Sequence, residues 1–307
     1  MELEGLFLKL AQQISTLSNL LPEPYIKAFE EAQNHSKARP ANQIKQQIET
    51  ELGAPINQLF SSFDDHPIGT ASIGQVHKAQ LVNGDTVAVK TQHLRIDEIA
   101  ELDLQLIKKL IKIVTYFIKI PGFDEMFQEV VKMIHEELNY KHEADQIDTI
   151  AQNFTGDNRI KIPKVYREYS TKKVLTMEFV EGEKITNHQF AKQHNLNQNQ
   201  LAKNILHLFS KSIFIDGIYH ADPHPGNMLI NEKGQLILID FGAIGNLSKN
   251  MKEGIIILIQ ASILKDENLM IAGFKKMGFI SSAPGINKIC KKIIHLVNDY
   301  LVNELKI

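Results

Sequence analysis

Short apolar runs separated by turn residues predict three pairs of β-strands in this chain. The first pair, over residues 76–81 and 86–90, flanks Asn83-Gly84, a dipeptide that strongly favours a tight hairpin turn. The other pairs are expected over residues 164–168 with 173–179, and over residues 228–230 with 236–239 across a turn at Lys233-Gly234. The first two pairs are followed by Glu181-Gly182, which we interpret as a connector.

Longer stretches with helical spacing predict that most of the remaining chain is helical. The expected helices cover residues 2–34 with a break at 22–24, then 41–52, 97–119, 124–153, 199–216 and 249 to the end. Apolar residues recur at helical spacing within the third of these helices, at Leu102, Leu106, Leu110, Ile113 and Phe117. We interpret this stripe as a face packed into the core. Residues 255–259 predict a buried helix in the same way.

Composition and charge exclude several classes of protein. The chain has 307 residues, of which 43% are apolar, enough for two lobes with their own cores. The 34 Lys and Arg nearly balance the 36 Asp and Glu, so the net charge is −2 and nothing indicates nucleic-acid binding. Cys290 is the only cysteine, so no intramolecular disulfide can form and a reducing compartment is expected.

No membrane-crossing or secretory segment is expected in the sequence. The acidic start, Met1-Glu2-Leu3-Glu4, differs from the basic start of a signal peptide, and residues 255–259 form an apolar run far shorter than a membrane span. We therefore predict a cytoplasmic protein. The sequence leaves open a peripheral contact with the inner face of a membrane.

The strongest chemical pattern lies in residues 220–227, followed by residues 236–242. It places Asp222, Asn227 five residues later, and Asp240 at the end of a short apolar strand. In protein kinases the first Asp accepts the proton of the substrate hydroxyl, while the Asn and the second Asp hold Mg²⁺ against the nucleotide phosphates. We predict that Asp222 is catalytic and that Asn227 and Asp240 bind Mg²⁺. Ordinary turn residues are the competing interpretation, because Asp and Asn favour turns.

A second pattern predicts the phosphate-binding end of an ATP site. Residues 69–76 fit G-x-G-x-x-G-x-V except that Ala71 replaces the middle glycine, and Lys90 closes a V-A-V-K run on the next strand. Small residues let backbone amides approach phosphates closely. The predicted nucleotide-binding residues are Gly69, Thr70, Ala71, Ser72, Ile73, Gly74, Val76, Lys90 and Glu178.

A lysine of this kind needs a carboxylate partner on a helix. Glu137 and Glu143 are the candidates, and they lie six residues apart, about 120° around a helix. They therefore need different partners. We assign Glu143 to Lys90, with Glu137 as the alternative, and include both among the catalytic residues.

Strands that precede helices, with these motifs in this order, predict an α+β protein with a bilobal, protein-kinase-like fold. We expect a helical N-terminal extension over residues 1–60, a small β-rich lobe with inserted helices over residues 61–182, and a mostly helical large lobe over residues 183–307.

Residues 71–77, 137–144 and 220–227 together resemble the UbiB/AarF family of atypical protein-kinase-like proteins. Lys9-Leu10-Ala11-Gln12 resembles the K-x-G-Q helix of that family, which folds over the active site. The resemblance implies that Lys9 and Gln12 join the nucleotide site. It also implies ATP hydrolysis, or phosphorylation of a small or lipid-like molecule rather than a protein, in support of ubiquinone biosynthesis. The implied partners are ATP, Mg²⁺, a lipid or quinone precursor and quinone-biosynthesis proteins.

The sequence departs from the family pattern at several positions. Ala11 replaces the glycine of K-x-G-Q, Asn139 replaces the aspartate of E-x-D, and Gly69-Thr70 stands where the family usually has alanine. The hydrophobic C-terminal tail of larger bacterial members is also missing from this sequence. We interpret the active-site set as intact and the N-terminal extension as altered.

Two other functions compete with an atypical kinase or ATPase. A nucleotide-sensing pseudokinase scaffold would bind ATP without appreciable turnover. An aminoglycoside or choline-type phosphotransferase shares the H-x-D-x-x-x-x-N form of residues 220–227 but does not account for residues 72–77. His220 and His224 are expected to be structural rather than metal ligands, because no further ligand lies at suitable spacing.

Overall fold

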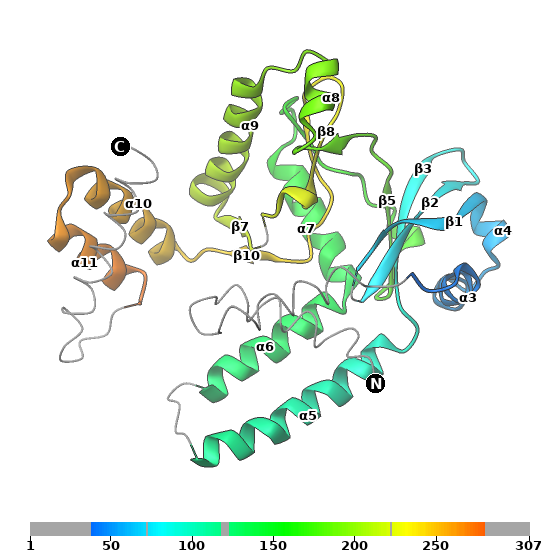
Figure 1. The fold of residues 1–307 in the computed structure, drawn as a ribbon, viewed down its shortest axis with the longest axis horizontal. Coiled ribbons are helices and arrows are strands. Elements are labelled where there is room, and N and C mark those ends of the chain that lie inside the picture. Colours follow the sequence, from blue (N-terminus) through cyan, green and yellow to red (C-terminus); the bar gives the residue numbers. More distant parts are fainter. Residues whose placement is uncertain (1–37, 72, 118–122, 222, 280–307) are drawn as a thin grey trace. The chain divides into compact units, whose positions relative to one another are not determined.

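The computed structural model describes residues 38–71, 73–117, 123–221 and 223–279, and Figure 1 shows its elements. Two compact units are present, residues 1–194 with 225–242 and residues 195–224 with 243–307. The mixture of helices and sheets confirms the predicted α+β class. The bilobal arrangement and the domain boundaries after residues 60 and 182 stay predictions.

The first unit is built on a four-stranded antiparallel sheet in the order β1-β2-β3-β5. These strands are β1 (Phe60–Thr70), β2 (Gly74–Leu81), β3 (Thr86–Gln92) and β5 (Val174–Glu178). The predicted turn between β2 and β3 is confirmed, and Gly84 adopts the positive φ of 93° that the turn requires. The edge strand β1 was not predicted, because nearly all of its residues are polar or exposed.

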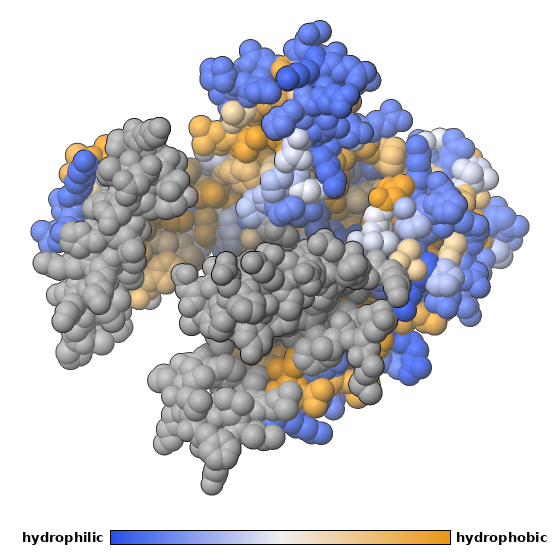
Figure 2. All heavy atoms as spheres, in the orientation of Figure 1, coloured by the Kyte–Doolittle hydropathy of each residue, from blue (hydrophilic) through white to orange (hydrophobic). Residues whose placement is uncertain are grey.

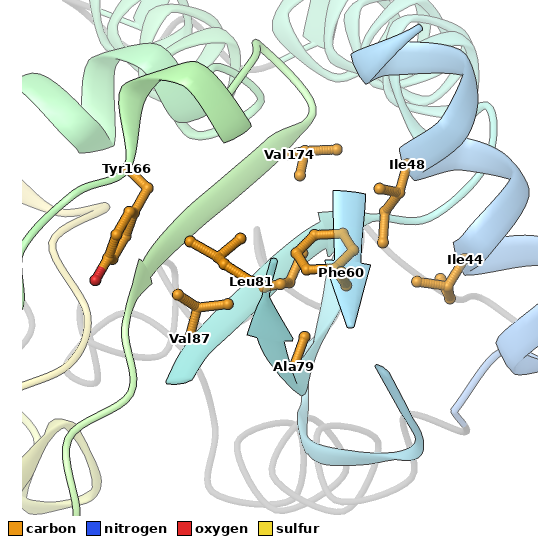
Figure 3. Close-up of a cluster of buried hydrophobic side chains, with 9 residues drawn as sticks. Ile44, Ile48, Phe60, Ala79, Leu81, Val87, Tyr166 and Val174 are labelled. Atoms are coloured by element: carbon orange, nitrogen blue, oxygen red, sulfur yellow. The ribbon is translucent and has the colours of Figure 1, made fainter. Parts of the chain in front are cut away.

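One face of this sheet forms a hydrophobic core with α3 (Ala41–Leu52), which is the predicted helix and ends at Gly53. Ile44 and Ile48 lie one helical turn apart and pack against Phe60 and Val174, as Figure 3 shows. The rest of this core comprises Ala79, Leu81, Val87, Val89 and Tyr166. Burying each aliphatic side chain of this kind contributes about 1.5–3 kcal/mol. This contact holds the strand that carries Lys90 against a rigid support.

Three helices connect β3 to β4: α5 (Ile96–Phe117), α6 (Phe123–Glu137) and α7 (Tyr140–Asn153). The prediction that Leu102 and Leu106 belong to the core is wrong, because these side chains are 66% and 49% exposed. The buried stripe is instead Ile96, Ala100 and Leu104, displaced around the helix. α5 has apolar residues on more than one side, so spacing alone selected the wrong face. The structure does not describe the side chains at positions 110, 113 and 117.

A second four-stranded sheet of the first unit has the order β4-β9-β8-β6. Its strands are β4 (Ile160–Lys161), β6 (Glu183–Lys184), β8 (Met228–Ile230) and β9 (Leu236–Leu238). The predicted hairpin of β8 and β9 is confirmed, with Gly234 at a φ of 74° in its turn. The predicted strand over residues 164–168 is wrong: a single bridge joins Val165 to Met177, and a 3₁₀ helix follows at Arg167–Tyr169.

Short helices complete the first unit, α4 (Ile56–Leu59), α8 (His188–Gln193) and a 3₁₀ turn at Pro225–Asn227. The second unit contains α9 (Gln198–Ser210), a π-helical turn at Lys211–Asp216, and the paired strands β7 (Ile218–His220) and β10 (Ile244–Asn246).

The second unit also contains the packed helices α10 (Lys249–Leu264) and α11 (Glu267–Lys276). Gly254 permits their close approach, because a Cβ there would lie 2.9 Å from the carbonyl oxygen of Gly273. The expectation of a fully buried helix over residues 255–259 is wrong, since Ile256 and Ile259 are exposed, and Figure 2 shows apolar surface where Figure 1 places α10. No helix in the described ranges has the length and apolar character needed to span a membrane.

Candidate functional site

Lys90 lies at the centre of a charged cluster on the sheet face opposite α3. Its Nζ is 2.7 Å and 2.9 Å from the two carboxylate oxygens of Glu143 and 3.4 Å from Oδ1 of Asp240. The side chains of Lys90 and Glu143 are only 17% and 5% exposed, whereas that of Asp240 is 40% exposed. Two elements distant in sequence, α7 and the segment after β9, therefore meet at one lysine.

The strand register explains why Lys90 faces this cluster. Val76 of β2 and Leu175 of β5 lie directly across from Lys90, and side chains alternate between the two faces of a strand. Val87, Val89 and Thr91 consequently point to the α3 core, while Ala88 and Lys90 point away from it. The V-A-V-K pattern thus gives the strand one apolar anchored face and one charged face.

Glu143 is fixed by the way α7 begins. The helical backbone is interrupted between α6 and α7 at Leu138-Asn139. The backbone N–H of Tyr140 donates to the carbonyl oxygen of Lys172 at 2.9 Å. Glu143 lies one turn into α7, and its Oε1 also accepts a 3.4 Å hydrogen bond from the backbone N–H of Phe241. The carboxylate therefore connects β3, α7 and the residue after Asp240.

Electrostatics favour a protonated lysine in this cluster. Burial disfavours the charged form of Lys90, but the adjacent carboxylates of Glu143 and Asp240 outweigh it and hold the pKa of the ammonium well above its usual range. Burial also raises the pKa of the Glu143 carboxyl, although Lys90 opposes that shift. The cluster thus favours the charged ammonium of Lys90 next to two acidic side chains.

The hairpin of β8 and β9 places Asn227 and Asp240 at the same end. Met228 pairs with Leu238, and the backbone N–H of Ile239 donates to the carbonyl oxygen of Asn227 at 3.2 Å. An amide and a carboxylate supply the hard oxygen atoms that Mg²⁺ prefers. The described residues contain no group of three His, Cys, Asp or Glu that could enclose a metal. Asn227 and Asp240 are therefore the residues of this hairpin that could hold a Mg²⁺.

The glycine-containing loop joins β1 to β2. The backbone N–H of Ala71 donates to the carbonyl oxygen of Gly74 at 2.8 Å, and Thr70 pairs with Gln75 across the turn. A Cβ at Gly74 would lie 2.5 Å from the carbonyl oxygen of Thr91 and 2.8 Å from Oη of Tyr140. Only glycine fits at this position. At Gly69 a Cβ would meet open space, so substitution there is sterically tolerated.

The structure does not bring every predicted site residue to Lys90. The Glu178 carboxylate contacts Lys161 at 2.7 Å, and its side chain shares the face of Val87 rather than that of Lys90. Ile73 is buried at the loop, and Glu137 ends α6. The predicted residues Lys9, Gln12, Ser72 and Asp222 lie outside the described residues.

Two buried side chains, one on each side of the sheet, were not among the predicted site residues. The ring centroid of Tyr140 lies 5.2 Å from Nζ of Lys90, a cation–π contact. The available signal was its position one helical turn before Glu143. His77 is fully buried on the opposite face, where its ring nitrogens lie 2.8 Å from Nε2 of Gln75 and 2.7 Å from the carbonyl oxygen of Asp64. His77 is therefore part of the support for the sheet.

A helix glutamate paired with a strand lysine, next to an aspartate that follows a short hairpin, defines the class of kinase-like proteins. The family model of the ABC1 atypical kinase-like domain matches residues 31–273. The chain belongs to this family, the UbiB/AarF family of atypical kinase-like proteins.

Individual relatives agree with this membership. AarF domain-containing protein kinase 1 of Gallus gallus is 34% identical over 255 residues, which cover 81% of this chain and 49% of the relative. The chloroplastic protein ACTIVITY OF BC1 COMPLEX KINASE 8 of Arabidopsis thaliana is 31% identical over 304 residues, 96% of this chain and 39% of the relative. The chain thus spans about half the length or less of these curated relatives.

A solved structure shares the fold. Rv3197 of Mycobacterium tuberculosis, in complex with erythromycin, superposes with a TM-score of 0.65 at 25% sequence identity. The match covers 99% of this chain and 77% of that one.

Proposed function

We propose that this chain binds Mg-ATP and acts as an atypical kinase or ATPase of the UbiB type. The observation that carries the proposal is the contact of Lys90 with both Glu143 and Asp240 in one cluster. In a kinase-type site the lysine orients the nucleotide phosphates, the helix glutamate holds the lysine, and the aspartate binds metal. The relatives that carry "kinase" in their names support the same reaction class.

Each residue of the proposed site has a separate task. Lys90 binds and orients the phosphates, and Glu143 keeps the ammonium in place. Asn227 and Asp240 would hold Mg²⁺, which offsets phosphate charge when it is bound. The backbone of residues 69–74 would approach the phosphates at the small residues of the loop, and Asp222 would orient the acceptor hydroxyl or water.

We further propose a small or lipid-like acceptor, or water, in support of isoprenoid quinone biosynthesis. The support is the resemblance of residues 71–77, 137–144 and 220–227 to the UbiB/AarF pattern, together with membership in that family. Contact with quinone-biosynthesis proteins and with the inner face of a membrane belongs to the same proposal.

The direct test is ATP turnover by the purified chain, with and without Mg²⁺, compared with the Asp240→Asn variant. We expect turnover to require Mg²⁺ and to fall at least about 100-fold in the variant, since removing an electrostatic group aimed at the transition state has effects of this order. Equal, metal-independent rates would refute the proposal.

A nucleotide-sensing scaffold is the second candidate function. It is favoured by Asn139, a neutral side chain at a family carboxylate position, whose Oδ1 is buried and has no hydrogen-bond partner within the described part of the chain. Thermal-shift titration separates the two candidates, because a ligand that binds the native state raises its stability. Stabilisation by Mg-ATP without turnover would support the scaffold.

A further inference from the structure

The hydroxyl of Tyr140 is buried and forms no hydrogen bond with any residue that the structure describes. Tyr140 is 1% exposed, and its Oη has no hydrogen-bond partner within the described part of the chain. Buried hydroxyls are nearly always hydrogen-bonded, and leaving one unbonded costs free energy. Phenylalanine would fill the same space without that cost, so packing alone does not account for a tyrosine.

The hydroxyl lies beside the phosphate loop. A Cβ added at Gly74, where the loop ends, would lie 2.8 Å from Oη of Tyr140, so the hydroxyl lies next to the backbone of this glycine. Gly74 and Lys90 belong to neighbouring strands, and their side-chain positions share one sheet face. The ring of Tyr140 is 5.2 Å from Nζ of Lys90. Tyr140 therefore lies between the end of the loop and the lysine.

The chemistry of this position favours an anionic acceptor. Burial raises the pKa of Tyr140, although the Lys90 charge opposes this, so the phenol stays protonated and able to donate. The adjacent Lys90 ammonium is also a donor. A phosphate oxygen can accept from both groups.

We propose that Tyr140 is a nucleotide-binding residue whose hydroxyl donates a hydrogen bond to a phosphate oxygen of Mg-ATP while its ring supports Lys90. The inference rests on the proposed function and adds a residue to that site.

The test compares Tyr140→Phe with Tyr166→Phe as a matched control. Both tyrosines are buried in the same unit, but the hydroxyl of Tyr166 donates to Oδ2 of Asp85 at 3.0 Å, on the other side of the sheet. The melting temperature without ligand is measured for each protein, and the Kd values of Mg-ATP and of adenosine are measured by titration.

For Tyr140→Phe we expect an unchanged or higher melting temperature and an affinity for Mg-ATP reduced roughly 10-fold or more, as for the loss of a hydrogen bond to a charged group. Its affinity for adenosine should not change. Tyr166→Phe should instead melt at a lower temperature and bind Mg-ATP normally.

An unchanged Mg-ATP affinity in Tyr140→Phe would overturn the inference while leaving the proposed function intact. The same applies if adenosine and Mg-ATP are weakened equally, because the effect would not pass through phosphate. If wild type itself binds no Mg-ATP, the proposed function fails, and the inference fails with it.

Discussion

The two faces of the β1-β2-β3-β5 sheet differ in the side chains that they bury. The face toward α3 is mostly apolar. Its buried His77 contacts Gln75 and Asp64, and Gln75 also bonds to the backbone of Arg39, whereas Oγ1 of Thr91 has no partner in the described part of the chain. The face of Lys90 carries buried charges and two buried oxygens, of Gln92 and Tyr140, without partners in the described part of the chain. The α3 face thus holds most of the apolar packing of the sheet, and the other face carries the charged and polar groups of the proposed nucleotide site.

The largest expected effect comes from Lys90→Met. It leaves Glu143 buried without its cation, and breaking a buried ion pair on one side costs about 3–5 kcal/mol. Turnover of ATP should also be lost. Urea unfolding and an ATP assay measure both effects.

Lys173→Met is the matched control for this variant. Lys173 pairs with Asp97 at 2.8 Å, but the pair is more exposed, so its loss should cost no more than about 1 kcal/mol. Equal losses of unfolding free energy in the two variants would show that the pair of Lys90 and Glu143 contributes no more than an ordinary surface ion pair.

Ile48→Ala should destabilise the hydrophobic core on the α3 face of the sheet. Ile48 is fully buried against the sheet, and a cavity of this kind costs about 2–5 kcal/mol. Under conditions where the variant is folded, we expect its affinity for Mg-ATP to equal that of wild type. Calorimetric titration together with urea unfolding checks the prediction, and a parallel loss of affinity would mean that the two faces are not separable.

Gly74→Ala probes the contact between loop and helix. Its Cβ would lie 2.5 Å from backbone and 2.8 Å from Oη of Tyr140, so the strand start must move, at a cost of about 1–3 kcal/mol. We expect reduced stability and weaker Mg-ATP binding. Gly69→Ala, whose Cβ meets open space, should not lose stability by this mechanism. If both variants unfold at the same urea concentration, the close packing at Gly74 has no energetic importance.

The smallest expected effect is a pH dependence of the Lys90→Met deficit. Without Lys90, burial and the charge of Asp240 both raise the pKa of Glu143. A carboxyl whose folded pKa is raised contributes stability below its unfolded pKa, about 4.3, and loses it as pH rises through the folded value. The stability deficit relative to wild type should therefore be smallest in acid and grow toward neutral pH.

Urea midpoints at about pH 5 and about pH 8 measure this change. The deficit of Ile48→Ala should be the same at both values, because no titrating group is involved. A deficit of Lys90→Met that does not depend on pH would contradict the burial of a charged Glu143.

Much of the fold could be predicted from local signals. The Asn83-Gly84 and Lys233-Gly234 turns predicted both hairpins, and Gly53 predicted the end of α3. β1 escaped prediction because an exposed edge strand needs no apolar pattern. On α5, apolar residues lie on several sides, and only tertiary packing selects which of them are buried.

In the candidate site, too, some features could be predicted from the sequence and others depend on tertiary packing. The pairing of Lys90 with Glu143 is the one preferred from the sequence. The expected 120° separation on one helix implied only that Glu137 and Glu143 have different partners. Glu137 and Glu143 do not share one helix, because α6 ends at Glu137 and α7 begins at Tyr140. The assumption of a continuous helix was therefore wrong, although the structure contains the preferred pairing. The proposed role of Tyr140 could not be inferred from the sequence, because it depends on a distance of a few ångströms between this helix residue and Gly74 of β2.

The most direct test of the central claim is the Mg-ATP-induced rise in melting temperature of wild type, Lys90→Met and Ile48→Ala. Both variants are expected to lose stability without ligand, so they differ only in the affected face of the sheet. We predict that Ile48→Ala retains the full rise and that Lys90→Met loses it. Equal rises in the two variants would contradict the claim that the Lys90 face is the nucleotide site.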